Sequence, residues 1–172
     1  MQYDYIALYH KNATFYHSRP RLKTLLRFAN GVLTYAFVLF YLALWAYSVF
    51  LADFAPHDYI RLFCIPVSAL FTVSMIRRAV SRPRPYAKDG ANIQPLTFRE
   101  GREDDSFPSR HVASAAVIAT VFLPYLPIVG CFLLLGVVCL GYTRFALGLH
   151  YPSDILVGAG LGIAFGLCAF VI

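Results

Sequence analysis

The feature that most constrains this chain is a run of 21 residues, Gly31–Leu51, without a single charged side chain. A helix rises 1.5 Å per residue, so this run is long enough to cross the roughly 30 Å hydrocarbon core of a bilayer. The whole chain is 59% hydrophobic and 14% charged, whereas soluble domains average about 45–50% and about 25%. The sequence therefore predicts an integral membrane protein and excludes a disordered chain, which would need low hydrophobicity and high charge.

Four more apolar runs follow the first one. Tyr59–Ile76 contains a single charge, and Asp154–Ile172 is 19 residues long. Between them, His111–Tyr125 and Ile128–Tyr142 form a hairpin whose turn contains two prolines. Each arm has only 15 residues, or roughly 23 Å of helix, which suits helices buried inside a bundle. We expect an all-α, multi-pass membrane helical bundle with about five transmembrane helices.

The first 30 residues are too polar to cross a membrane. Within them, Arg21–Asn30 places three leucines on one side and basic residues elsewhere, a pattern typical of a short helix lying in the membrane interface. We therefore expect an N-terminal interfacial segment over residues 1–30 and a membrane-embedded domain over residues 31–172. The plasma membrane is the expected location.

Three glycines recur at four-residue spacing in the last apolar run: Gly158, Gly162 and Gly166. Small residues on one face of a helix let a second helix approach closely. We interpret these glycines as packing positions and not as functional residues.

Counting the spans places three polar clusters at the same end of the bundle. They are the segments Arg77–Pro85, Pro108–His111 and Thr143–Asp154, each of which lies where a span ends or begins. Fourteen of the 15 basic residues fall on that side of the membrane. Charged and titratable groups at membrane depth are costly, so their convergence indicates a functional site.

The side chains of these clusters suit a phosphate group. Arg77, Arg84 and Arg144 carry guanidinium forks that match phosphate oxygens. Ser109 directly precedes an apolar helix and is the expected N-cap, with unpaired backbone N–H groups next to it that can hold an anion. His111 lies in the first turn of that helix and would face the bound anion.

His150 and Asp154 are four residues apart, within reach of each other. A carboxylate that holds one imidazole nitrogen fixes the tautomer and makes the other nitrogen a better nucleophile or base. Together with a second histidine and three arginines, this pair fits phosphoryl transfer through a phosphohistidine. The net charge of +6 then indicates an anionic lipid more than nucleic acid, because basic nucleic-acid binders carry their charge on a solvated face.

The three clusters resemble the motifs of the type-2 phosphatidic acid phosphatase and vanadium haloperoxidase superfamily. The first motif is matched by Arg77 and Arg84-Pro85 with six residues between the arginines, and the second by the sequence Pro-Ser-Arg-His at residues 108–111. The third is matched by Thr143-Arg144, His150 and Asp154. In the first motif the alternative pair Arg82-Pro83 would need a basic residue at position 75, which is methionine. With the span pattern, the resemblance covers roughly residues 31–172.

The resemblance implies a helical phosphatase that needs no metal or cofactor and acts on a membrane lipid phosphate or diphosphate. It implies that His150 attacks phosphorus, that Asp154 orients His150, and that His111 protonates the leaving oxygen. Candidate substrates are phosphatidate, phosphatidylglycerol phosphate and a polyprenyl diphosphate. The implied phosphate-binding residues are Arg77, Arg84, Ser109, Arg110 and Arg144. The resemblance also implies that a backbone amide near Arg110 binds the phosphoryl oxygens.

The sequence departs from the usual motifs at three positions. Arg77 stands in place of lysine, Thr143 in place of serine and Arg110 in place of glycine. Two roles stay open for Arg110: it contacts a second phosphate or a headgroup, or it forms a salt bridge with an acidic residue of the preceding loop. The candidates for that salt bridge are Glu103, Asp104 and Asp105.

Two other classes of function remain as alternatives: a vanadate-dependent peroxidase, and a non-catalytic protein that binds or transports lipids. The side of the membrane that the site faces also stays open. The positive-inside rule places the basic end in the cytoplasm, whereas the resemblance more often implies a site that faces outward. The oligomeric state is not predicted.

Overall fold

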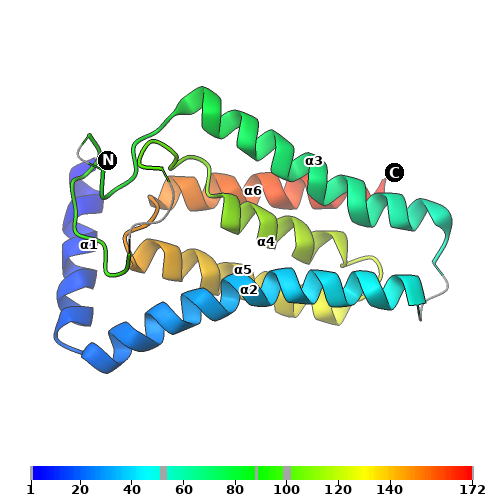
Figure 1. Cartoon of the computed structure of the whole chain (residues 1–172), viewed down its shortest axis with the longest axis horizontal. Helices are drawn as coiled ribbons and strands as arrows, with labels where there is room; N and C mark the ends of the chain where they lie inside the picture. Colours follow the sequence, from blue (N-terminus) through cyan, green and yellow to red (C-terminus); the bar gives the residue numbers. More distant parts are fainter. Residues whose placement is uncertain (1, 51–53, 88, 99–101, 172) are drawn as a thin grey trace.

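The computed structural model describes residues 2–50, 54–87, 89–98 and 102–171. It is an all-helical bundle with no strand among the described residues, as the sequence predicts (Figure 1). The predicted ends at Met1, Leu51 and Ile172 lie outside the described residues. In chain order the elements are α1 (Gln2–His17), α2 (Pro20–Phe50), α3 (Pro56–Val80), α4 (Arg110–Val121), α5 (Pro127–Ala146), α6 (Pro152–Leu167) and the 3-10 helix η1 (Cys168–Phe170).

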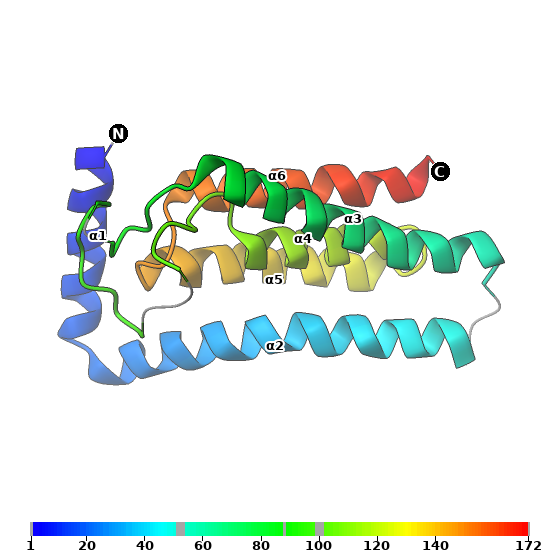
Figure 2. The same ribbon diagram turned by 45° about the horizontal axis from the view of Figure 1, so that its top comes forward.

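Among the described residues, four helices are long and apolar enough to cross a membrane: α2, α3, α5 and α6 with η1. The fifth apolar segment, α4, has only 12 residues and spans about 18 Å. It lies in the middle of the bundle, where it packs against α2, α3, α5 and α6 (Figure 2). Nine of its 12 residues are buried. The protein is thus a multi-pass membrane bundle built around one short central helix.

The two arms of the predicted hairpin differ from expectation in length and burial. Helix α4 ends at Val121 and not at Tyr125, because Pro124 has no N–H and disfavours helical geometry in the residue before it. Helix α5 continues past Tyr142 to Ala146, so Arg144 lies in its last turn. Only α4 is the buried helix that the short arms suggest; α5 exposes large apolar side chains on its outer face.

The N-terminal region also differs from the prediction. Arg21–Asn30 is not a separate interfacial helix but the beginning of the 31-residue helix α2. No proline lies at the junction with the apolar run, and the isolated glycine there, Gly31, is tolerated inside the helix. The expected boundary at residue 30 therefore falls inside a helix. The N-terminal helix is instead α1, which crosses the end of the bundle in both views (Figures 1 and 2).

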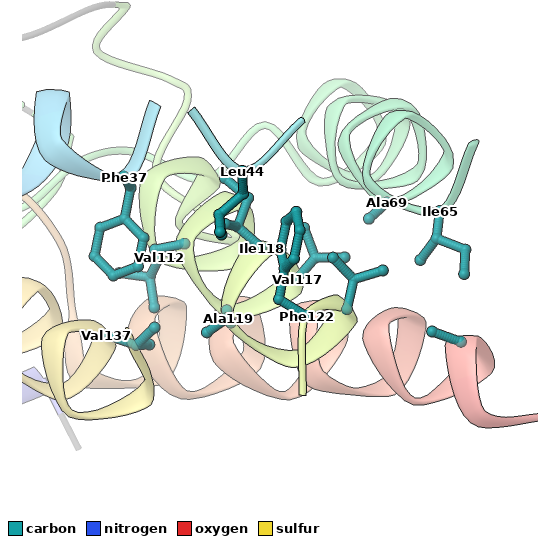
Figure 3. Packing of buried hydrophobic residues seen from close by; sticks show 14 of the residues in the cluster. Phe37, Leu44, Ile65, Ala69, Val112, Val117, Ile118, Ala119, Phe122 and Val137 are labelled. Atoms are coloured by element: carbon teal, nitrogen blue, oxygen red, sulfur yellow. The ribbon is translucent and has the colours of Figure 1, made fainter. Parts of the chain in front are cut away.

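The central packing is between α4 and α6, and it depends on small residues on both helices. Buried side chains of α4 such as Val117 and Ala119 form the core with apolar residues of the surrounding helices (Figure 3). On α6, a Cβ atom added to Gly162 would lie 2.6 Å from Ala116 Cβ, and one added to Gly158 would lie 2.7 Å from the Ser109 carbonyl oxygen. Both distances are too short for any side chain, so these glycines are packing positions, as predicted.

Helix α1 packs through one stripe of residues: Tyr5, Tyr9, Ala13 and Tyr16 are buried. Together with loop residues that include Leu147 and Leu149, the stripe forms a second hydrophobic cluster. The Tyr9 hydroxyl donates a hydrogen bond of 2.6 Å to the Gln94 carbonyl oxygen, and Asn12 Nδ2 donates one of 2.8 Å to the Ala146 carbonyl oxygen. Helix α1 therefore holds both the loop that follows α3 and the end of α5 with the loop after it.

Candidate active site

The three predicted polar clusters lie at one end of the bundle. Helices α3 and α5 end there, α4 and α6 begin there, and α1 lies across it (Figure 1). The α3–α4 and α5–α6 linkers lie at this end, while the opposite end holds the α4–α5 turn. Residues more than 70 positions apart in the sequence are therefore neighbours.

His150 stands in the short loop between α5 and α6 and is 1% exposed. Gly148, with φ +77°, turns the chain back just before it. Because this is the left-handed region, glycine is the residue that fits. His150 Nδ1 lies 2.9 Å from the Ser106 carbonyl oxygen and 3.6 Å from Asp154 Oδ2. A carbonyl oxygen only accepts hydrogen bonds, so Nδ1 carries the proton and Nε2 keeps its lone pair.

Asp154 is the third residue of α6, and its carboxylate is completely buried. Oδ2 accepts hydrogen bonds from the backbone N–H of Tyr151, at 3.0 Å, and from the Ser106 hydroxyl. The first of these is the acidic half of a capping box, which satisfies an N–H group at the start of the helix. Oδ1 accepts a hydrogen bond of 2.7 Å from Arg82 Nη1. The carboxylate thus faces His150 but makes its direct hydrogen bonds to three other residues.

The pKa of His150 is lowered from its ordinary value, mainly because burial disfavours the charged imidazolium. The nearby Asp154 carboxylate opposes this effect, and the positive charges of Arg84 and Arg144 lower the pKa of His150 further. The result is a neutral imidazole at neutral pH, which is the form that can act as a nucleophile.

The predicted arginines occupy different positions around His150. The guanidinium groups of Arg84 and Arg144, both buried, are close enough to act electrostatically on both His150 and His111. Arg77 is buried as well, but its terminal nitrogens donate hydrogen bonds to the carbonyl oxygens of Pro108, at 2.9 Å, and Asp105. Arg84 and Arg144 are thus the two arginines that flank both histidines, and Arg77 holds the loop before α4.

Ser109 occupies the N-cap position of α4, as expected, but its hydroxyl does not cap the helix. Its Oγ atom is buried without a hydrogen-bond partner among the described residues. A buried hydroxyl in that condition is costly unless a ligand satisfies it. The first N–H groups of α4 also lack a side-chain cap. This corner of the site therefore offers hydrogen-bond donors to an anion.

His111 and Arg110 line a groove of about 470 Å³ between α2, α3 and α4. Apart from these two residues, its walls are mostly apolar, with Phe37 and Ile118 among them. Arg110 is exposed, and its guanidinium forms no ion pair with another described residue. Of the acidic residues considered for it, Asp104 pairs with Arg102 and Asp105 with Arg77.

Two residues that the sequence analysis did not select contact the predicted pair. Arg82 binds the Asp154 carboxylate, and Ser106 contacts both His150 and Asp154. Arg82 lies inside the first motif, but the register of that motif favours Arg84 over Arg82. Ser106 acts partly through its backbone carbonyl, which no residue type encodes.

Residues 58–172 match the PAP2 superfamily, and the chain belongs to that family. This confirms the resemblance drawn from the three motifs. Among curated proteins, the chain is similar to the lipid A 1-phosphatases of Rhizobium johnstonii and Rhizobium etli, with 28% identity to each over 112 residues. The aligned part is 64% of this chain and 46% and 48% of those proteins, so the chain spans about half the length of the curated relatives that it matches.

Two solved structures are similar over most of the chain. One is a transmembrane PAP2-type phosphatidylglycerolphosphate phosphatase from Bacillus subtilis, with a TM-score of 0.78, 21% identity, and coverage of 99% of this chain and 84% of that one. The other is Aquifex aeolicus LpxE, with a TM-score of 0.60, 26% identity, and coverage of 87% and 94%. The first likeness establishes the fold, since its identity is too low to carry more.

Proposed function

We propose that this protein is a metal-independent phosphatase of membrane lipids and that it works through a phosphohistidine at His150. The observation that carries the proposal is a buried, neutral imidazole flanked by Arg84 and Arg144, with His111 opening into a lateral apolar groove. A nucleophile, an anion site and a surface for hydrocarbon chains are thus side by side. Family membership and the lipid phosphatases among the relatives support the same reading.

In the first step, the lone pair of His150 Nε2 attacks phosphorus, the N–P bond forms and the P–O bond to the lipid breaks. The leaving oxygen takes a proton from His111. The phosphorylated ring keeps its Nδ1 proton and gains positive charge, which the Asp154 carboxylate offsets from 3.6 Å. In the second step, His111 takes a proton from water, the water oxygen attacks phosphorus and the N–P bond breaks. Inorganic phosphate leaves, and both histidines return to their starting forms.

The arginines serve this reaction by stabilising the charge that develops on the phosphoryl oxygens. Arg84 and Arg144 are the direct candidates, with the Ser109 hydroxyl and the first N–H groups of α4 as further donors. The positive charges of Arg84, Arg110 and Arg144 all face His111. A bound phosphate dianion would offset them and favour the protonated His111 that the leaving oxygen requires.

The groove beside His111 supports a lipid substrate. Its walls come from helices of spanning length, at Phe37 on α2 and Leu70 on α3, and from Ile118 on α4. A hydrocarbon chain in this groove would remain at membrane depth while its phosphate reached His111. The candidate substrates are phosphatidate, phosphatidylglycerol phosphate, a polyprenyl diphosphate and, from the curated relatives, the 1-phosphate of lipid A.

The test is phosphate release from this panel of lipids by the purified protein in detergent, with and without a chelator. We expect release from at least one lipid, unchanged by the chelator and abolished in His150→Ala. His17→Ala is the matched control because His17 is exposed on α1. Full activity in His150→Ala would refute the phosphohistidine.

The same preparation separates the two alternatives. Halide oxidation with added vanadate and peroxide would indicate a peroxidase. Binding of the lipids without phosphate release would indicate a non-catalytic lipid-binding or transport protein.

A further inference from the structure

Arg82, in the loop after α3, contacts the buried carboxylate beside the nucleophile. Its Nη1 atom donates hydrogen bonds of 2.7 Å to Asp154 Oδ1 and 2.8 Å to Ser153 Oγ. The Asp154 side chain is 0% exposed, and a buried carboxylate needs a compensating charge. Within the described part of the chain, Arg82 is the only permanent cation at ion-pair distance from Asp154; the other partner is the titratable His150.

Arg82 is also connected to the group that holds His150. Its backbone carbonyl accepts a hydrogen bond of 2.9 Å from the Ser106 N–H. The Ser106 carbonyl in turn accepts from His150 Nδ1, and the Ser106 hydroxyl donates to Asp154. These contacts connect Arg82 to the His150 imidazole in two ways. One passes through the Asp154 carboxylate, and the other passes through Ser106.

The guanidinium of Arg82 is fixed by an aromatic ring. Its Cζ atom lies 4.3 Å from the centre of the Tyr151 ring, a cation–π distance. Tyr151 is fixed in turn, because Tyr5 of α1 packs against its ring at 4.8 Å and its hydroxyl accepts a hydrogen bond from the Ala91 N–H. The geometry of the arginine is thus set by helix α1 and by the loop after α3.

We infer that Arg82 is a positioning residue for the proposed reaction, which keeps Asp154 ionised and in place beside a neutral His150. The inference rests on the proposed function. Without Arg82, the negative charge of Asp154 would be balanced by a proton on His150, and a protonated imidazole has no lone pair for attack on phosphorus. The other charged or titratable groups that face His150 are Arg84, Arg144 and His111, and they remain in the variants used below.

The experiment compares Arg82→Gln and Arg82→Lys with Arg78→Gln, in the full chain in detergent. Arg78 is the matched control because it is an exposed arginine at the end of α3. We expect Arg82→Gln to lower kcat by roughly 10- to 100-fold, because misplacing a reacting group by about 1 Å can cost about 100-fold in rate, while KM stays within about twofold. The acid limb of its pH profile should move to higher pH. Arg82→Lys should restore much of kcat because it keeps the charge.

A direct readout does not need turnover. In protein with ¹⁵N-labelled histidine, the resonance absent from His150→Ala identifies His150, and its titration should move to higher pH in Arg82→Gln. The inference is overturned if Arg82→Gln matches Arg78→Gln in both kcat and titration, or if its loss lies in KM alone. If the wild type releases no phosphate from any lipid, the proposed function fails, while the titration still decides the role of Arg82.

Discussion

Replacing Gly158 by alanine adds one methyl group where α6 contacts the start of α4. The new Cβ atom would lie 2.7 Å from the Ser109 carbonyl oxygen and 3.3 Å from the Ser109 nitrogen. An ordinary contact begins at 3.4 Å, so the backbone at Ser109 must move by about 0.7 Å. That segment cannot yield as a flexible side chain would, because the Ser109 N–H is already bound to the Asp154 carbonyl oxygen at 2.9 Å.

The displacement would be transmitted to the reacting groups. On the α4 side of the contact, His111 lies two residues after Ser109. On the α6 side, Asp154 lies in the first turn of the helix and His150 just before it. Overpacking of this kind destabilises a protein by about 1–3 kcal/mol, and a displacement near 1 Å of a reacting group reduces the rate by up to about 100-fold. We therefore expect Gly158→Ala to lower kcat by roughly 10- to 100-fold and to lower the melting temperature.

The assay is phosphate release from the best lipid of the panel, together with thermal unfolding in detergent. Gly160→Ala is the matched control, since it makes the same change two residues away, where an added Cβ meets nothing within 4 Å. It should leave both measurements near those of the wild type. Equal kcat and equal melting temperature in the two variants would show that the α4–α6 contact does not set the site geometry.

Three further predictions use other parts of the site. Gly148→Ala should destabilise the protein by at least about 1 kcal/mol in thermal or denaturant unfolding, because alanine is strained at φ +77° and its Cβ would lie 2.8 Å from the Tyr9 ring; unchanged stability would contradict this. Because the pKa of His150 is lowered from 6.5, the stability that its neutral form contributes should be complete above about pH 6.5 and lost as the pH falls towards the folded-state pKa; the pH dependence of unfolding, compared with that of His150→Ala, checks this. Arg110→Gly should reduce kcat/KM for a prenyl diphosphate several-fold more than for the matching monophosphate if Arg110 contacts the second phosphate, and equal losses would exclude that role.

The spans and the three clusters were predictable because each depends on residue types in short stretches of sequence. Uncharged runs reveal the helices that cross the membrane, and the alternation of spans then places the clusters at one end. Helix ends were less predictable. The fourth apolar run was predicted to end at Tyr142, before the polar pair Thr143-Arg144, but no proline or glycine stops α5 before Ala146. Residues 1–30 were predicted only as an interfacial segment, and helix α1 was not predicted within it although Tyr5, Tyr9 and Tyr16 recur on one helical face.

The relation between His150 and Asp154 shows why contacts are harder to predict than neighbours. The four-residue spacing correctly brings the two side chains together, at 3.6 Å. However, Asp154 stands at the third position of helix α6, where its carboxylate accepts a hydrogen bond from the Tyr151 N–H at the helix start. Its other oxygen is bound by Arg82, and the Nδ1 proton of His150 goes to a backbone carbonyl of a loop that lies 44 residues earlier in the chain. Since backbone carbonyls are the same in every residue, the orientation of the nucleophile depends on the path of that loop, and only the tertiary structure determines that path.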